Sequence, residues 1–155
     1  MLPLWWQQEC PATQVTKMTE EAKKEAPAVS ATRSLRVFVL EDDPDRIRLL
    51  AQWLIGCDWD CIHTCVREEE FRPPYDLILL DHDLGGRQLV EHEDNGLSFV
   101  RLIKDRINEE ADIIVHSYNP DGAKSMVAEL KPFRVQWVPF STQIERYIKA
   151  LRLRH

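Results

Sequence analysis

The chain has 155 residues, of which 44% are hydrophobic and 30% are charged, and its net charge at pH 7 is -6. This length suffices for one domain with a real hydrophobic core. The negative charge argues against a strongly basic nucleic-acid-binding surface. No apolar stretch approaches the roughly 20 residues that span a bilayer, and the opening MLPLWW lacks the features of a signal peptide. We therefore expect a cytoplasmic protein with no membrane partner.

Residues 1–34 are expected to form a disordered N-terminal tail, because TEEAKKEAPAVSATRS shows no apolar period. Met18, just before that stretch, is a second candidate for the start of translation. From residue 35 onward, strand-like and helix-like segments alternate. The expected strands are 35–40, 59–66, 75–80, 112–117 and 134–140. The expected helices are 43–56, 67–73, 95–108, 120–131 and 141–154.

This alternation predicts the fold. Strands and helices that alternate with short connections imply a parallel sheet with helices on both faces. The run YDLILL is continuously apolar, as expected of a central strand that is covered on both sides. Residues 35–155 are therefore expected to form one flavodoxin-like domain, a three-layer α/β/α structure with a five-stranded parallel sheet.

The spacing of three cysteines in CDWDCIHTC, Cys57, Cys61 and Cys65, suggests a metal site. However, residues four apart on a strand are separated by ~13 Å, whereas thiolates that share a zinc ion each lie ~2.3 Å from it. Because Trp59 and Ile62 favour a strand, one strand cannot gather these sulfurs. We expect reduced cysteines that pack in the core.

Ionisable side chains follow three of the expected strands at the point where each strand ends. In an open parallel sheet, ligands bind beyond these ends. Carboxylates gathered there repel one another unless a cation neutralises them, and hard oxygen ligands suit Mg²⁺ or Mn²⁺. The predicted metal ligands are Glu41, Asp42, Asp81 and Asp83. Asp43 is instead expected to cap the following helix.

Polar side chains near these carboxylates complete the candidate site. His82 directly follows Asp81, and His116 ends the fourth strand. Because imidazole titrates near neutrality, one ring can accept a proton while another donates one. Ser117 and Asn119, which come next along the chain, are expected to bind phosphate oxygens.

The order and spacing of VFVLEDDPDR, YDLILLDHDLGG, NGLSFVRLIK and IIVHS resemble the receiver domains of two-component response regulators, over about residues 35–151. The resemblance implies that Glu41 and Asp42 correspond to the receiver acid pair and Asp81 to the phosphoacceptor. Ser117 stands where receivers carry Ser or Thr.

The sequence also departs from the receiver pattern. Val138 replaces the lysine before Pro-Phe, and an apolar side chain supplies neither its charge nor its donors. The loop between Asp81 and Gly96 is longer than in receivers and contains Arg87 and His92. Histidines such as His82 are generally absent from the centre of ordinary receivers.

The segments DHDL and HSYNPDGAKSM resemble a divergent group, the cyclic-phosphate-processing receiver domains. This resemblance implies metal-dependent hydrolysis or processing of a cyclic phosphate, with His82, His116 and Asp81 as catalytic residues. The implied partner is a phosphate-containing small molecule, such as a nucleotide, or an RNA end.

Two other interpretations remain open. The chain is alternatively an atypical stand-alone receiver, in which Asp81 is phosphorylated or a protein partner is bound without phosphorylation. In a third interpretation, DHD is the Asp-x-Asp motif of haloacid-dehalogenase-like phosphatases, with Asp81 as nucleophile and Asp83 as acid. That motif normally ends the first strand of its domain, whereas here it ends the third.

Overall fold

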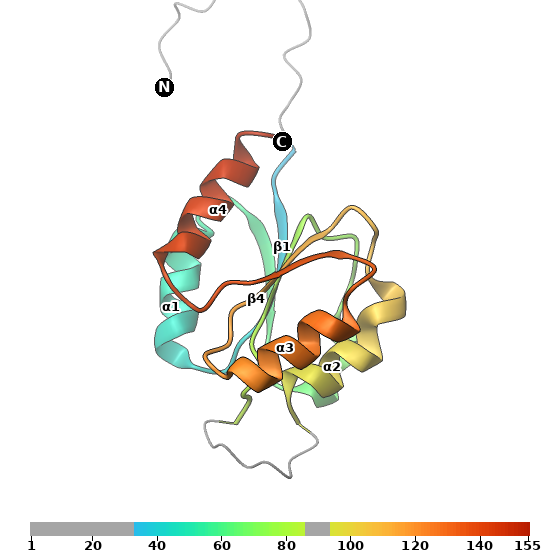
Figure 1. Ribbon diagram of the computed structural model, residues 1–155. Helices are drawn as coiled ribbons and strands as arrows, with labels where there is room; N and C mark the ends of the chain where they lie inside the picture. Colours follow the sequence, from blue (N-terminus) through green and yellow to red (C-terminus); the bar gives the residue numbers. More distant parts are fainter. Residues whose placement is uncertain (1–32, 86–93) are drawn as a thin grey trace, which may run out of the picture. The chain divides into compact units, whose positions relative to one another are not determined.

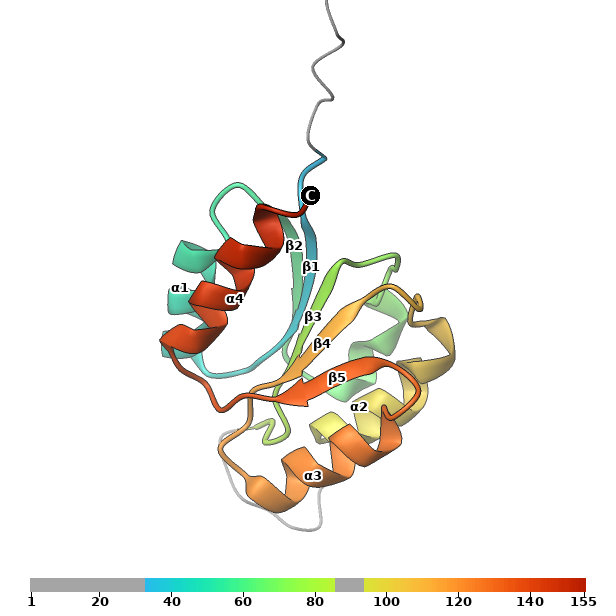
Figure 2. The same cartoon turned by 45° about the horizontal axis from the view of Figure 1, so that its top comes forward.

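Five strands form one parallel sheet in the spatial order β2-β1-β3-β4-β5 (Figure 2). The strands are β1 (Arg36–Leu40), β2 (Asp58–Ile62), β3 (Leu77–Leu80), β4 (Asp112–Val115) and β5 (Arg134–Trp137). This order is that of flavodoxin-like domains and confirms the predicted fold class. The computed structural model describes residues 33–85 and 94–155, so the tail predicted for residues 1–34 lies almost wholly outside the described residues.

Helices cover both faces of the sheet, which gives the three predicted layers (Figure 1). One face carries α1 (Pro44–Trp53) and α4 (Thr142–Arg152), and the other carries α2 (Gly96–Ile103) and α3 (Pro120–Glu129). Two short 3-10 helices, η1 (Cys65–Glu70) and η2 (Lys104–Arg106), precede β3 and follow α2.

The connection between β2 and β3 differs from its prediction. Residues 67–73 were expected to form a helix, but the chain forms the 3-10 helix η1, in which the backbone of Arg67 is non-helical. Three successive glutamates with no apolar stripe give a longer helix little to pack with. Strand β2 ends at Ile62, four residues before the expected end, because the chain turns into η1.

The core consists of two apolar clusters, one on each face of the sheet. Alternate residues of β1 face opposite sides, as pleating requires, so Val37 and Val39 join the cluster under α1 and α4, and Phe38 joins the other. The Phe38 ring centroid lies 4.9 Å from that of Phe71 and 5.6 Å from that of Phe99. The rigid sheet between these clusters fixes the ends of the strands.

Side-chain caps set where the helices begin. Asp43 Oδ1 accepts hydrogen bonds from the backbone N–H groups of Asp45 and Arg46, which confirms it as the N-cap of α1. Asn119 caps α3 through Gly122 N–H, and Ser141 caps α4. Both α1 and α3 start with proline, whose fixed φ suits the first helical position.

Cys57 and Cys61 are free thiols that are partly buried against the cluster under α1 and α4. The side chain of Cys65 lies outside the described residues. Within the described part of the chain, no helix is long and apolar enough to cross a membrane.

Candidate functional site

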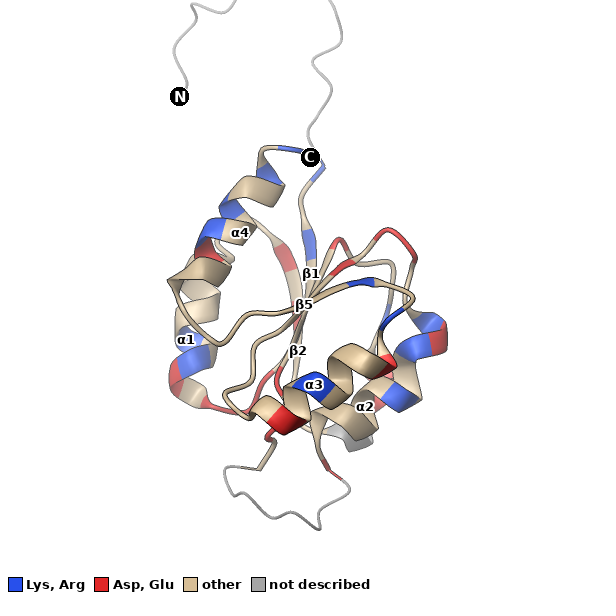
Figure 3. Cartoon of the chain, viewed as in Figure 1, with Lys and Arg blue, Asp and Glu red and all other residues tan. Residues whose placement is uncertain are grey.

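The carboxyl ends of β1, β3 and β4 bring three buried polar residues side by side. Backbone N–H of Asp81 donates to Leu40 O (2.9 Å), and N–H of His116 donates to Leu80 O (2.8 Å). Glu41, Asp81 and His116 therefore continue the parallel ladder by one position beyond each strand. Figure 3 shows acidic segments at this end of the sheet, where α1 and α3 begin. This register brings the ends of neighbouring strands together at one edge of the sheet, as the sequence predicted.

Glu41, Asp42 and Asp81 form a carboxylate trio that could hold a metal ion. One oxygen of each lies within 4.8 Å of the others. Glu41 and Asp81 are 0% and 1% exposed. Glu41 Oε1 accepts from the N–H groups of Asp42 (3.0 Å) and Asp43 (2.9 Å), whereas Glu41 Oε2 and Asp81 Oδ2 are buried and accept no hydrogen bond from the described residues.

Burial changes the acidity of two members of this trio. It raises the pKa of Glu41 to about 7, against the lowering effect of the N–H of Asp43. Burial also raises the pKa of Asp81, although the guanidinium of Arg46 opposes this shift. Two buried carboxylates side by side favour a bound cation over two free charges.

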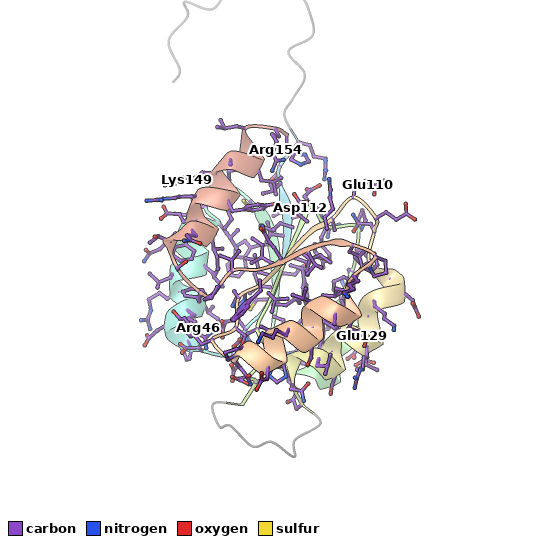
Figure 4. All side chains as sticks on the ribbon, viewed as in Figure 1. Arg46, Glu110, Asp112, Glu129, Lys149 and Arg154 are labelled. Atoms are coloured by element: carbon purple, nitrogen blue, oxygen red, sulfur yellow. The ribbon has the colours of Figure 1, made fainter. Side chains whose placement is uncertain are left out.

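Arg46, on the first turn of α1, lies beside the trio and was missed by the sequence analysis. Its Nη1 is 3.4 Å from Glu41 Oε2 and 3.3 Å from Asp81 Oδ2, and its Nε is 3.6 Å from Asp43 Oδ2. Figure 4 marks Arg46 at the end of α1 that faces this edge of the sheet. A signal was present in the sequence, because Arg46 lies three residues after the predicted cap Asp43, where a helix turns back toward its cap.

His82, Asp83 and Asn119 form a second polar group, at the N-terminus of α3. Asp83 Oδ1 is 2.8 Å from His82 Nδ1 and accepts a hydrogen bond from Asn119 Nδ2 (3.0 Å). Burial raises the pKa of Asp83, but the hydrogen bonds from His82 and Asn119 outweigh it and leave this pKa below its usual value. Asp83 is therefore ionised, and it lies outside the trio formed by Glu41, Asp42 and Asp81. Its predicted role as a metal ligand stays a prediction.

The His82 ring packs directly on the backbone of α3. A Cβ atom on Gly122 would lie 2.4 Å from Cγ and 2.5 Å from Nδ1 of His82, so only glycine fits there. The backbone of His82 is also fixed, because its N–H donates to Asp81 Oδ1 and its carbonyl accepts from Gly96 N–H. The ring thus contacts the backbone of α3 and the side chain of Asp83, and the backbone of His82 is bonded to Asp81 and Gly96.

His116 and Ser117 are fully buried behind the trio. His116 Nδ1 lies 3.7 Å from Glu41 Oε2, and neither ring nitrogen makes a hydrogen bond with the described residues. Burial, aided by the charge of Arg46, lowers the pKa of His116 to about 3, so its ring is neutral. Ser117 lowers the pKa of Asp81 against the effect of burial, and its Oγ accepts from Asn119 N–H (3.1 Å).

Comparison with known proteins identifies the family. Residues 37–132 match the family model described as the cyclic-phosphate processing receiver domain. The chain belongs to this family. None of the curated proteins matches it.

Solved receiver structures share the fold of this receiver domain. The BeF3-activated DrrB receiver domain is 15% identical, with a TM-score of 0.57, and the match covers 79% of this chain and 100% of that one. The response regulator TrrA from Thermotoga maritima, in complex with Mg²⁺-BeF, is 20% identical with a TM-score of 0.55, covering 76% and 98%. The Mn²⁺-bound form of the response regulator Rcp1 is 16% identical with a TM-score of 0.50, covering 76% and 89%.

This domain differs from ordinary receivers at the position that the sequence indicated, Val138. Val138 follows β5 and packs, partly buried, against the cluster under α1 and α4. No ammonium group therefore approaches the trio from this position. The segment with Arg87 and His92 lies outside the described residues, apart from the glycine at its start, where Gly85 N–H donates to Asp42 Oδ2.

The residues present fit a divalent cation. Glu41, Asp42 and Asp81 offer hard oxygen atoms, and two of those atoms are buried without a hydrogen-bond donor. Asp42 is the least buried member of the trio, and its Oδ2 accepts a hydrogen bond from Gly85 N–H. These three residues would hold Mg²⁺ or Mn²⁺.

Proposed function

We propose that this receiver domain hydrolyses a cyclic phosphodiester with the help of a divalent cation. The observation that carries the proposal is the histidine–carboxylate pair beside the trio. Asp83 accepts from His82 Nδ1, which fixes the tautomer and leaves Nε2 as the basic nitrogen. A base oriented by a third group is the arrangement that acid–base catalysis requires.

The reaction requires a balanced exchange of bonds and protons. A water oxygen forms a bond to phosphorus, one ring P–O ester bond breaks, and the leaving oxygen gains the proton that the water loses. We assign to His82 Nε2 the role of taking that proton and returning it to the leaving oxygen. When bound, a divalent cation polarises phosphoryl oxygens and lowers the pKa of water.

The surrounding residues of the chain bind and orient the phosphate. Ser117 and the N-terminus of α3, where Asn119 caps Gly122 N–H, lie at this edge of the sheet. A helix N-terminus favours a phosphate group. The side chain of Asn119 serves this role indirectly, because its oxygen caps α3 and its nitrogen contacts Asp83. His116 is buried and neutral, and its Nδ1 lies 3.7 Å from Glu41 Oε2.

The substrate class that suits this site is a small phosphate compound, such as a nucleotide, or the terminal cyclic phosphate of an RNA. Figure 3 shows basic segments along α4, which lies on the face shared with α1. In this region Lys149 pairs with Glu145 and Arg152 contacts Cys57, which leaves a solvated helix face in place of a groove for a nucleic-acid strand. Recognition would then rest on the phosphate group itself.

A second candidate function is phosphoryl acceptance by Asp81. The observation that favours it is Asp81 Oδ2, which accepts no hydrogen bond from the described residues, although Arg46 Nη1 lies 3.3 Å from it. The apolar side chain of Val138 weighs against it, because it offers no donor to a phosphoryl group. In that function a protein partner would read the phosphorylated state. Incubation with acetyl phosphate and Mg²⁺ followed by intact-protein mass measurement tests it.

An activity panel tests the proposed hydrolysis. Oligonucleotides that end in a cyclic phosphate and ribonucleoside cyclic phosphates are incubated with the protein and Mn²⁺, and the mass of each is followed. We expect conversion to a phosphate monoester by the wild type and by the control His155→Ala, and loss of conversion in His82→Ala. Equal conversion by His82→Ala, or none by the wild type, contradicts the proposal.

A further inference from the structure

Arg46 holds a positive charge inside the site, in a position that charge neutralisation alone does not explain. A single nitrogen of Arg46, Nη1, lies 3.4 Å from Glu41 Oε2 and 3.3 Å from Asp81 Oδ2. This nitrogen makes no hydrogen bond with the described residues. A guanidinium that only paired with a carboxylate would use its planar fork, with two parallel N–H···O bonds. Arg46 therefore lies beside the carboxylates with donors still to be satisfied.

Aromatic rings hold the guanidinium at the edge of the site. Its carbon lies 5.7 Å from the ring centroid of Tyr118 and 5.7 Å from that of Phe140. Tyr118 is fixed in turn, because its hydroxyl donates to Phe140 O (2.6 Å). The Arg46 side chain is 20% exposed, although its Nη1 is buried. The two rings restrain the guanidinium, which lowers the entropy lost when an anion binds.

Arg46 supplies positive charge to the site. Among the described lysines and arginines, Arg46 alone has a side-chain nitrogen within 4.0 Å of a carboxylate oxygen of Glu41 or Asp81. The position that carries lysine in receivers is Val138, and Val138 faces the core. A dianionic transition state of phosphate hydrolysis needs donors and positive charge, and arginine binds two phosphate oxygens at once.

We propose that Arg46 is the phosphate-binding residue of this domain and takes over, from α1, the role of the lysine that Val138 has replaced. This inference rests on the proposed function, since it assigns a binding group to that same site. A cation held by Glu41, Asp42 and Asp81 would occupy the carboxylate oxygens that Arg46 now contacts. The N–H donors of Arg46 are then available to the substrate phosphate.

The test compares Arg46→Gln with Arg48→Gln. Arg48 is on the same helix but is 70% exposed and pairs with Asp45, away from the trio, so it is a matched control. Binding of a ribonucleoside cyclic phosphate and of inorganic phosphate is measured by calorimetry with Mn²⁺ present, and Mn²⁺ affinity is measured separately. We expect Arg46→Gln to weaken phosphate binding about tenfold to a hundredfold, with undiminished Mn²⁺ affinity, and Arg48→Gln to bind as the wild type does.

The outcomes separate this inference from the proposed function. Wild-type phosphate binding by a folded Arg46→Gln overturns the role of Arg46, even if the wild type hydrolyses its substrate. Loss of phosphate binding in Arg46→Gln supports that role, even if the wild type hydrolyses nothing and the proposed function fails. Absence of phosphate binding by the wild type overturns the inference.

A second variant covers the case in which Arg46→Gln does not fold. Arg46→Lys keeps the positive charge next to Glu41 and Asp81 but loses the planar fork. We expect it to fold and to bind phosphate several-fold more weakly than the wild type, and unchanged binding would again overturn the inference.

Discussion

Nδ1 of His82 lies 2.8 Å from Oδ1 of Asp83, directly after the buried carboxylate of Asp81. This contact explains why the chain places three ionisable residues after an apolar strand. Asp81 belongs to the trio that could hold a cation, whereas His82 and Asp83 contact each other and lie outside that trio. Asn119, from the start of α3, completes the pair by a further hydrogen bond to Asp83.

The His82–Asp83 pair predicts a graded loss of activity. We expect His82→Ala to lower kcat for cyclic phosphate hydrolysis by about a hundredfold to ten-thousandfold, the range of general acid–base catalysis. Asp83→Asn should lower kcat less, because the ring stays in place but its tautomer is no longer fixed. Steady-state kinetics measure both, with His155→Ala as the control. Equal rates in Asp83→Asn and the wild type would show that Asp83 does not orient His82.

The carboxylate trio predicts metal-dependent stability. A ligand that binds only the folded state at a hundred times its Kd stabilises it by about 2.7 kcal/mol. We therefore expect saturating Mn²⁺ to raise the Tm of the wild type and EDTA to reverse the change. Asp81→Asn should lose this response, whereas Asp45→Asn, whose side chain is 84% exposed on α1, should keep it. A full Tm increase in Asp81→Asn would place the ion elsewhere.

The contact between Gly122 and the His82 ring predicts that a larger residue at position 122 lowers hydrolysis without changing Mn²⁺ affinity. Alanine normally stabilises a helix interior by about 1 kcal/mol relative to glycine. At Gly122, however, the new Cβ would lie 2.4 Å from the His82 ring, so the ring must move. We expect Gly122→Ala to reduce hydrolysis and leave the Mn²⁺ affinity unchanged. Ser125→Ala, at an exposed position of the same helix, is the control, and an active Gly122→Ala would show that this ring position is not needed.

Tyr75 predicts how stability depends on alkaline pH. Burial, together with the hydrogen bond to Asp60, raises its pKa from 10.0 to about 12. Because the unfolded state loses this proton first, the stabilising effect is complete below pH 10.0 and is lost as the pH rises toward about 12. The expected slope is at most about 1.4 kcal/mol per pH unit. Urea unfolding across this range should give a shallower slope for Tyr75→Phe, and identical slopes would contradict the assignment.

The sequence predicted that Glu41, Asp81 and His116 lie together, because the ends of the strands can be located from the sequence. Apolar runs reveal strands, and parallel strands end at one edge of the sheet, so Glu41, Asp81 and His116 had to meet there. The cap of α1 was predictable for a similar reason, since Asp43 precedes Pro44. For Cys57 and Cys61 the prediction of reduced, packed thiols is confirmed, because both are partly buried and free.

The remaining contacts depend on how separate elements pack, which the sequence pattern does not encode. Arg46 reaches the trio only because α1 packs against the sheet with its first turn above Asp81. Asp83 was predicted as a metal ligand, which stays a prediction, and its hydrogen bond from Asn119 Nδ2 of α3 was not predicted. Burial behind Glu41 likewise set the neutral state of His116, which its residue type alone does not indicate.

The central claim is that this domain adds water across a cyclic phosphate, and isotope transfer tests it most directly. A ribonucleoside cyclic phosphate is incubated with the protein and Mn²⁺ in water that contains heavy oxygen, and the product is weighed by mass spectrometry. We predict a phosphate monoester that carries one heavy oxygen atom on phosphorus, formed by the wild type and not by His82→Ala. A substrate that stays intact with the Mn²⁺-loaded wild type, or a product that forms equally with His82→Ala, would contradict the account.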